Sequence, residues 1–161
     1  MNNINEKNWI TGSGNKIDFY QILKIIKKQV FQGSKIFIGS DSFMSGPKVC
    51  FATAICLYGN KSNSRYFFFR ENEKIKKFKP LVSRITEETR RSVEVGCLLA
   101  DEYGFDLSNI ELHLDVSPLA AGNATSKFSD MLKGYVQGYG FDYRLKPDAW
   151  ASQSIADRHS K

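Results

Sequence analysis

Two aspartates stand where predicted strands meet short loops, and both are placed to bind a ligand. Asp41 comes just after a short apolar run, and its neighbours Gly39, Ser40 and Ser42 are small. Asp115 is the last polar residue of the strictly alternating segment 110–116. Because sites in α/β sheets are built at strand ends beside loops, we predict one site that contains both carboxylates. For each aspartate taken alone, a turn cap or a solvated strand face is the alternative.

Predicted helices supply further carboxylates. Glu88 falls in the apolar seam of the long central helix, where a carboxylate is costly unless it is paired or bound to a cation. Glu94 lies toward the other side of that helix and is the alternative to Glu88. In the last helix, Asp148 and Asp157 are about half a turn out of phase, so both do not face one site. We prefer Asp148, whose own alternative is to cap the helix and favour its dipole.

The order of predicted elements indicates how these acids are positioned. Three strands follow one another, and strands and helices then alternate, which is typical of a mixed sheet with helices on both faces. Residues 1–34 are predicted to form a leader and an amphipathic helix, and residues 35–161 the domain that holds the site. The predicted elements are a helix at 17–31, strands at 35–40, 49–58 and 65–70, a helix at 81–103, a strand at 110–116, a helix at 127–139, a strand at 141–145 and a helix at 148–158.

Composition favours one water-soluble domain. The chain has 161 residues, of which 42% are hydrophobic and 25% charged. No apolar run approaches the ~20 residues of a membrane span, and the N-terminus lacks the apolar core of a signal peptide. A cytoplasmic protein that does not bind membranes is expected. The three cysteines, Cys50, Cys56 and Cys97, are predicted to be buried free thiols.

The charge of the chain permits a polyanionic partner. The formal net charge is +6, and the segment 74–79 reads Lys-Ile-Lys-Lys-Phe-Lys. Arg84, Arg90 and Arg91 follow it. Interleaved lysine and aromatic residues are able to hold a phosphate backbone and stack a base, whereas a solvated surface is the alternative.

These motifs together resemble a known family. The order of the acids, on an early strand, a helix, a later strand and a final helix, is similar to that of the RNase H-like superfamily. Within roughly residues 35–161, the chain more closely resembles the YkuK-like family of predicted RNase H-related nucleases. The stretches that carry this resemblance are Gly-Ser-Asp-Ser (39–42), His-Leu-Asp (113–115), Gly122-Asn123 with Ser126, and Lys-Pro-Asp-Ala-Trp-Ala-Ser (146–152).

The resemblance implies a fold and a metal site. The fold is an RNase H-like α/β domain with a mixed five-stranded sheet, in which a three-strand antiparallel meander precedes two parallel strands, with helices on both faces. Carboxylate oxygens are hard donors, suited to two Mg²⁺ or Mn²⁺ ions that clamp a phosphodiester. The expected catalytic metal ligands are Asp41, Glu88, Asp115 and Asp148, with Glu94 and Asp157 in reserve.

The expected activity is metal-dependent hydrolysis of RNA, an RNA–DNA hybrid or branched DNA by a two-metal mechanism. A non-catalytic nucleic-acid-binding domain on the same fold is the first alternative, and an interaction protein with a degenerate site is the second. For His113 the alternative to substrate contact is a structural role. For Asn123 and Ser126 the alternative is ordinary turn chemistry. The side chains predicted to contact substrate are Ser42, His113, Asn123, Ser126 and Lys146.

Overall fold

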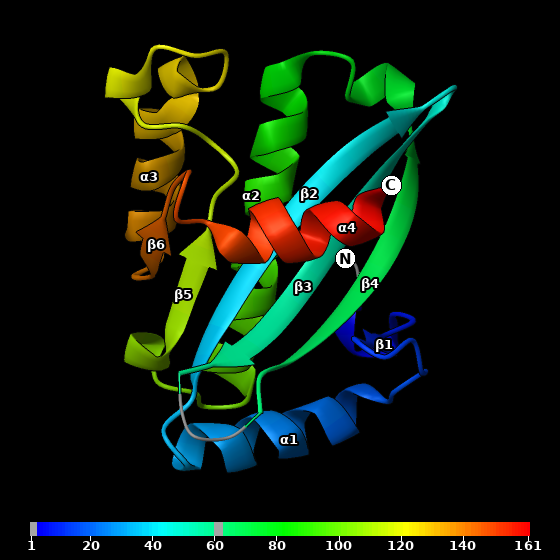
Figure 1. Ribbon diagram of the computed structural model, residues 1–161, viewed down its shortest axis with the longest axis vertical. Helices are drawn as coiled ribbons and strands as arrows, with labels where there is room; N and C mark the ends of the chain where they lie inside the picture. The colour runs from blue at the N-terminus through cyan, green and yellow to red at the C-terminus, as the bar shows by residue number, and fades with distance from the viewer. Residues whose placement is uncertain (1–2, 60–62) are drawn as a thin grey trace.

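The computed structural model describes residues 3–59 and 63–161 and shows one mixed sheet with helices on both faces (Figure 1). Residues 1–2 and 60–62, which belong to the expected leader and to the turn between the second and third expected strands, lie outside the described residues. The strands are β1 (Ile10–Thr11), β2 (Lys35–Ser45), β3 (Lys48–Tyr58), β4 (Arg65–Lys74), β5 (Ile110–His113) and β6 (Asp142–Arg144). The main helices are α1 (Phe19–Phe31), α2 (Leu81–Cys97), α3 (Ser129–Gly138) and α4 (Asp157–Ser160).

Within residues 3–59 and 63–161 the sheet has six strands in the order β1-β4-β3-β2-β5-β6, not the five that the sequence predicts. The additional strand, β1, comes from the expected leader and pairs antiparallel with the edge of β4, with Ile10 opposite Phe68. A strand of two residues is too short to show an alternating pattern in the sequence, so β1 is recognisable only by its pairing with β4.

Strands β2, β3 and β4 form the predicted antiparallel meander, but β2 is longer than expected. It continues through Asp41 to Ser45, where Ser45 pairs with Lys48 across a tight turn. Aspartate and serine are poor strand formers, which is why the sequence suggests a strand end at residue 40. Cross-strand pairing overrides that preference, and Asp41 lies inside the strand, opposite Ala52.

The parallel part of the sheet ends beside the middle of β2. Strand β5 pairs with β2 from Ile36 and Ile110 to Gly39 and His113. Beyond Gly39, within the described residues, β2 pairs with β3 along one edge and has no strand partner along the edge that faces β5. The carboxyl end of β5 therefore leaves a gap in the strand pairing next to the part of β2 that carries Asp41.

Helices α1, α2 and α3 share one hydrophobic core with one face of the sheet. That core also includes Ile4 and Trp9 from the expected leader, and the Trp9 ring packs on Phe19 and Phe69. The expected boundary between residues 34 and 35 thus lies within a single core. No helix in the described part of the chain is long and apolar enough to cross a membrane.

The last helix crosses the opposite face of the sheet, in front of β2 and β3 in Figure 1. It consists of a π-helical segment, η7 (Ala151–Ala156), followed by α4. It begins later than the sequence predicts, because residues 146–148 form a turn in which the Asp148 N–H donates to the carbonyl of Leu145 at 2.8 Å. This shift changes which acids the helix carries.

A glycine in β2 brings the last helix close to the sheet. A Cβ atom built on Gly39 would lie 2.4 Å from the backbone nitrogen of Ser152 and 2.5 Å from the carbonyl carbon of Ala151. Because the only atoms available to move there are backbone atoms, a side chain at this position would displace the helix. Gly39, two residues before Asp41, therefore sets the distance between the sheet and the last helix.

Candidate metal centre

Three of the predicted acids meet at the gap beside β2. Asp41, Glu88 and Asp115 each offer one carboxylate oxygen, and these oxygens all lie within 4.8 Å of one another. Gly39 pairs with His113 across the parallel strands, and Asp41 and Asp115 each lie two residues further on. Since side chains alternate along a strand, both aspartates continue the row on the side of the last helix.

Glu88 reaches this cluster from α2, on the other side of the sheet. It is 7% exposed, as its place in the apolar seam predicts. The Ser42 hydroxyl donates a hydrogen bond of 2.6 Å to Glu88 Oε1. One turn further along α2, Ser92 and Ser40 join their hydroxyls at 2.8 Å and hold the helix to β2. Glu94 instead accepts a hydrogen bond from Arg90 at 2.8 Å on the outer side of α2.

Burial and mutual repulsion raise the pKa values of two members of the cluster. Burial is the largest cause of the rise in the pKa of Asp41 from 3.8 to about 7, and Asp115 contributes next. Burial, followed by the charge of Asp41, raises the pKa of Glu88 well above its usual value. Hydrogen bonds from Ser160 to Asp41 and from Ser42 to Glu88 oppose these rises.

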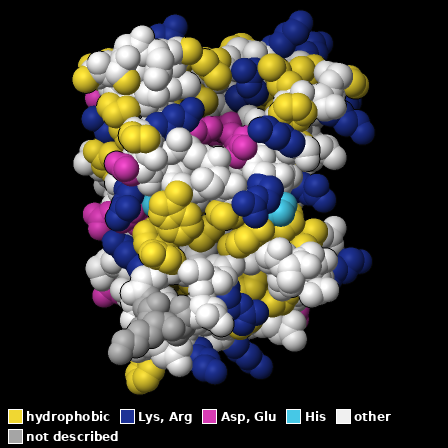
Figure 2. Space-filling view, in the orientation of Figure 1, with side chains coloured by type: hydrophobic (Ala, Val, Ile, Leu, Met, Phe, Trp, Pro, Cys, Tyr) yellow, Lys and Arg dark blue, Asp and Glu magenta, His cyan; other side chains and the backbone are white. Residues whose placement is uncertain are grey.

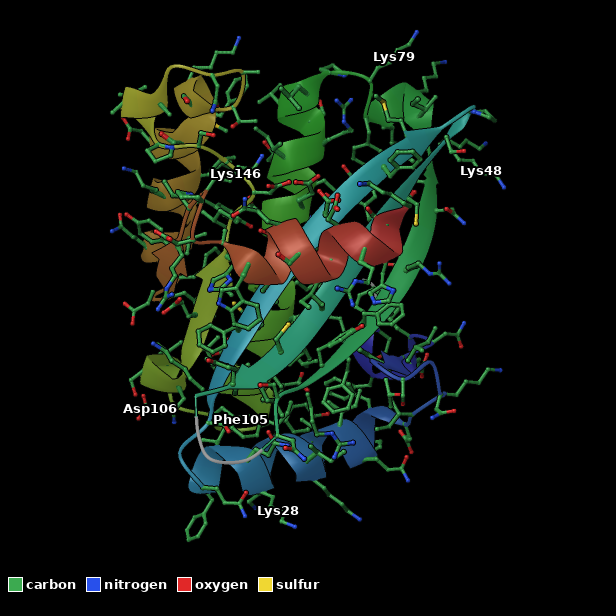
Figure 3. The ribbon with its side chains drawn as sticks, in the orientation of Figure 1. Lys28, Lys48, Lys79, Phe105, Asp106 and Lys146 are labelled. Atoms are coloured by element: carbon green, nitrogen blue, oxygen red, sulfur yellow. The ribbon has the colours of Figure 1, made fainter. Side chains whose placement is uncertain are left out.

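Lys146 lies at the edge of the cluster. Its ammonium group is 3.0 Å from Asp115 Oδ1, and its side chain is about one-third exposed. Figure 2 shows an acidic patch flanked by basic side chains on this face, and Figure 3 places Lys146 beside it. Of the residues predicted to contact substrate, Ser42 and Lys146 are therefore the two that contact acids of the cluster.

The last helix brings Ser160 and Asp157 to Asp41. The Ser160 hydroxyl donates to Asp41 Oδ2 at 2.9 Å, and the charge of Asp157 is among the causes that raise the pKa of Asp41. Asp148 is exposed in the turn before the helix, Asp157 pairs with Lys161, and neither is part of the three-carboxylate cluster. Sequence reasoning missed Ser160, although it lies three residues after Asp157 and hence on the same helical face.

His113 is buried and holds the last helix. It is 1% exposed, its Nδ1 accepts the Ala151 N–H at 2.9 Å, and its Nε2 is 3.0 Å from Glu111 Oε1. With Nδ1 accepting, Nε2 carries the proton and donates to Glu111. The structure thus gives His113 the positioning role that was the alternative to substrate contact.

Asn123 and Ser126 form hydrogen bonds within their own loop. The Asn123 N–H donates to Ser126 Oγ at 3.0 Å, and the Ser126 hydroxyl donates to Asn123 Oδ1 at 3.1 Å. The Asn123 amide also donates to Ser117 Oγ at 2.6 Å. These bonds shape the loop that follows Asp115, which is the turn chemistry considered for them.

The chemistry of the cluster fits a hard divalent cation. Its donors are carboxylate oxygens, which Mg²⁺ and Mn²⁺ prefer. Burial and the neighbouring carboxylates raise the pKa values of Asp41 and Glu88, so the charged forms of both are costly in the protein alone. A cation bound among these oxygens would supply the missing charge.

Comparison with known proteins agrees with this geometry. A family model described as Ribonuclease H-like matches residues 19–161, which is most of the chain and includes all three acids of the cluster. A search of curated proteins found no match to this chain.

Proposed function

This chain belongs to the Ribonuclease H-like family, and from that premise we propose that it is a metal-dependent nuclease that hydrolyses phosphodiester bonds. The observation that carries the proposal is the convergence of Asp41, Glu88 and Asp115, whose carboxylate oxygens lie within 4.8 Å of one another. Three carboxylates from a strand, a helix and a strand end supply the hard oxygen donors that such chemistry requires.

We propose that Asp41, Glu88 and Asp115 hold one Mg²⁺ or Mn²⁺ ion, and that Asp41 shares a second ion with an acid of the C-terminal segment. Of the two acids considered there, Asp157 has the better support, because its charge acts on Asp41 whereas Asp148 is exposed in a turn. Bound divalent ions supply electrostatic stabilisation of an attacking water and a leaving oxygen in phosphodiester hydrolysis.

The residues around the acids have separate tasks in this proposal. Ser160 and Ser42 orient Asp41 and Glu88 by donating to one oxygen of each carboxylate. Lys146 offers a cation at the rim, where it is able to leave Asp115 and meet a phosphate of the incoming strand. The substrates to test are RNA, an RNA–DNA hybrid and branched DNA.

The acidic cluster also favours a nuclease over a non-catalytic nucleic-acid-binding domain. A domain that only binds phosphate gains nothing from three converging carboxylates, because they repel a polyanion. A cytoplasmic location is part of the proposal and is supported by the three cysteines, which are free.

The test is cleavage of a panel of labelled substrates (hybrid, single-stranded RNA, duplex DNA and a four-way junction) with Mg²⁺ or Mn²⁺. We expect Asp41→Asn and Asp115→Asn to abolish cleavage and to remove the rise in melting temperature that Mn²⁺ causes. Glu94→Gln, which removes an acid outside the cluster, is the matched control and should keep both. A folded Asp41→Asn protein with normal turnover would refute the proposal.

A further inference from the structure

A basic projection extends from the strand that carries Asp41. Strand β2 continues four residues beyond Asp41 to Ser45, and the turn begins at Gly46, which is roughly 16 Å from Asp41 at the usual strand rise of about 3.3 Å per residue. The short helix η2 (Ile75–Lys77) packs against this turn, since the Ile75 N–H donates to the Pro47 carbonyl at 3.0 Å. We call residues 43–48 and 74–79 the basic finger.

The finger carries positive charge that the described protein leaves unpaired. Its five lysines are exposed, and within residues 3–59 and 63–161 none of them forms an ion pair. They are Lys48, Lys74, Lys76, Lys77 and Lys79.

Nearby acids do not offset this charge. Glu71 and Glu73, which precede the finger on β4, both pair with the buried Arg91, and Glu71 also pairs with Lys7. Figure 3 shows Lys48 and Lys79 at the same end of the molecule, opposite the end at which Lys28 of α1 lies. The finger is thus a local cationic surface.

Apolar side chains lie between the acidic cluster and the lysines. Phe43 is 42% exposed and Met44 is 44% exposed, and they lie two and three residues beyond Asp41 along β2. An exposed aromatic ring next to a row of cations suits a nucleic-acid strand, in which bases stack on the ring while phosphates meet the lysines. An acidic protein surface would use the lysines but would have no flat partner for the ring.

We propose that the basic finger binds the nucleic-acid strand on one side of the acidic cluster. Its lysines hold phosphates about five nucleotides from Asp41, given about 3.4 Å per nucleotide in a stacked strand, and Phe43 stacks on a base between them. The choice of ligand rests on the proposed nuclease function, whereas the surface itself is defined by the finger alone. The finger therefore sets the length of substrate that the protein grips.

The test measures binding without cleavage. Fluorescence anisotropy with labelled 20-nucleotide single strands and duplexes, in EDTA, compares the wild type with the triple variant Lys76→Ala, Lys77→Ala, Lys79→Ala. The matched control removes three exposed lysines from α1, as Lys24→Ala, Lys27→Ala, Lys28→Ala. Circular dichroism and melting temperature should be the same for all three proteins, because only exposed side chains change.

We expect the finger variant to bind about tenfold or more weakly at about 50–100 mM salt, and the α1 variant to stay within about twofold of the wild type. The slope of log K against log salt should fall by about 0.7–0.9 for each phosphate contact that is lost. The stronger loss with single strands or with duplexes identifies the form that the finger grips.

A second pair of variants separates stacking from charge. Phe43→Ala should weaken binding about fivefold or more with an unchanged salt slope, whereas Phe31→Ala, at an exposed phenylalanine of α1, should have no effect.

Equal losses of binding affinity in the two lysine variants, or no loss in either, would refute the role of the basic finger without affecting the nuclease proposal. Finger-dependent binding without cleavage of any substrate would overturn the nuclease and leave the finger.

Discussion

Replacing Gly39 with alanine tests how the last helix is held against the acidic cluster. The new Cβ would lie 2.4 Å from the Ser152 nitrogen and 2.8 Å from the Ala151 carbonyl oxygen. Ordinary van der Waals contact begins at 3.4 Å, so the helix backbone must move away by about 1 Å. Because this helix carries Asp157 and Ser160, the movement draws both away from Asp41.

The expected cost has two parts that separate measurements resolve. Overpacking of this kind costs about 1–3 kcal/mol of unfolding free energy, which lowers the melting temperature of a chain of this size by about 3–10 °C. A displacement of about 1 Å in a catalytic arrangement costs up to about 100-fold in rate. The cleavage rate of Gly39→Ala should therefore fall by much more than the fraction of the variant that is unfolded at the assay temperature.

The assay combines thermal unfolding, Mn²⁺ titration and cleavage at a temperature well below the transition. Gly134→Ala is the control, because among the described residues a Cβ there meets no heavy atom within 4 Å and the position lies inside α3. It should leave cleavage unchanged and stabilise the helix by up to about 1 kcal/mol. A Gly39→Ala protein that melts and cleaves like the wild type would show that the last helix is not held by this contact.

Three further predictions concern the charges of the site. Without metal, Asp41→Asn should raise the free energy of unfolding at pH 8 by roughly 2–4 kcal/mol, and this gain should vanish near pH 4. The reason is that the pKa of Asp41 is raised to about 7 in the folded protein, so between pH 4 and pH 8 the folded state binds a proton that the unfolded state has released. Asp157→Asn should weaken Mn²⁺ binding and cleavage, whereas Asp148→Asn at an exposed turn should change neither. Lys146→Ala should lower the Mn²⁺ concentration at half-saturation severalfold, because the ammonium group 3.0 Å from Asp115 competes with a cation.

Each of these predictions has a measurement that contradicts it. Chemical denaturation at pH 4 to 8 that shows equal stability for wild type and Asp41→Asn would contradict the raised pKa. If isothermal titration shows that Asp148→Asn binds Mn²⁺ more weakly than Asp157→Asn does, Asp148 is the better candidate ligand. The same titration with unchanged affinity in Lys146→Ala would show that the lysine does not compete with the ion.

The acids on regular elements could be predicted from the sequence, because periodicity determines where side chains point. Strand alternation placed Asp115 on the polar row, and helical spacing placed Glu88 rather than Glu94 in the buried seam. Both arguments are local, and the family match supports the fold in which they meet. The meander was predictable for the same reason, since apolar runs separated by turn residues leave few other pairings.

The parts that the sequence did not reveal depend on contacts between distant segments. Strand β1 exists because the edge of β4 is available, and no pattern in two residues predicts that pairing. The start of the last helix depends on the turn at residues 146–148 and on His113, whose Nδ1 accepts the N–H of Ala151. The sequence predicts Asp148 in the first turn of that helix, whereas the structure places Asp148 in the preceding turn and Asp157 on α4, and local pattern does not fix such a boundary.

Each carboxylate of the cluster has one donor from elsewhere in the chain, and this division bears on how the site works. Ser160 donates to Asp41, Ser42 to Glu88, and Lys146 pairs with Asp115, so one oxygen of each acid is engaged in this way. Such bonds fix the orientation of the acids before any ligand arrives. They do not remove the repulsion, since the pKa values of Asp41 and Glu88 stay raised. The protein therefore holds its acids in place while leaving them short of positive charge, and a cation that enters gains free energy without having to organise the site.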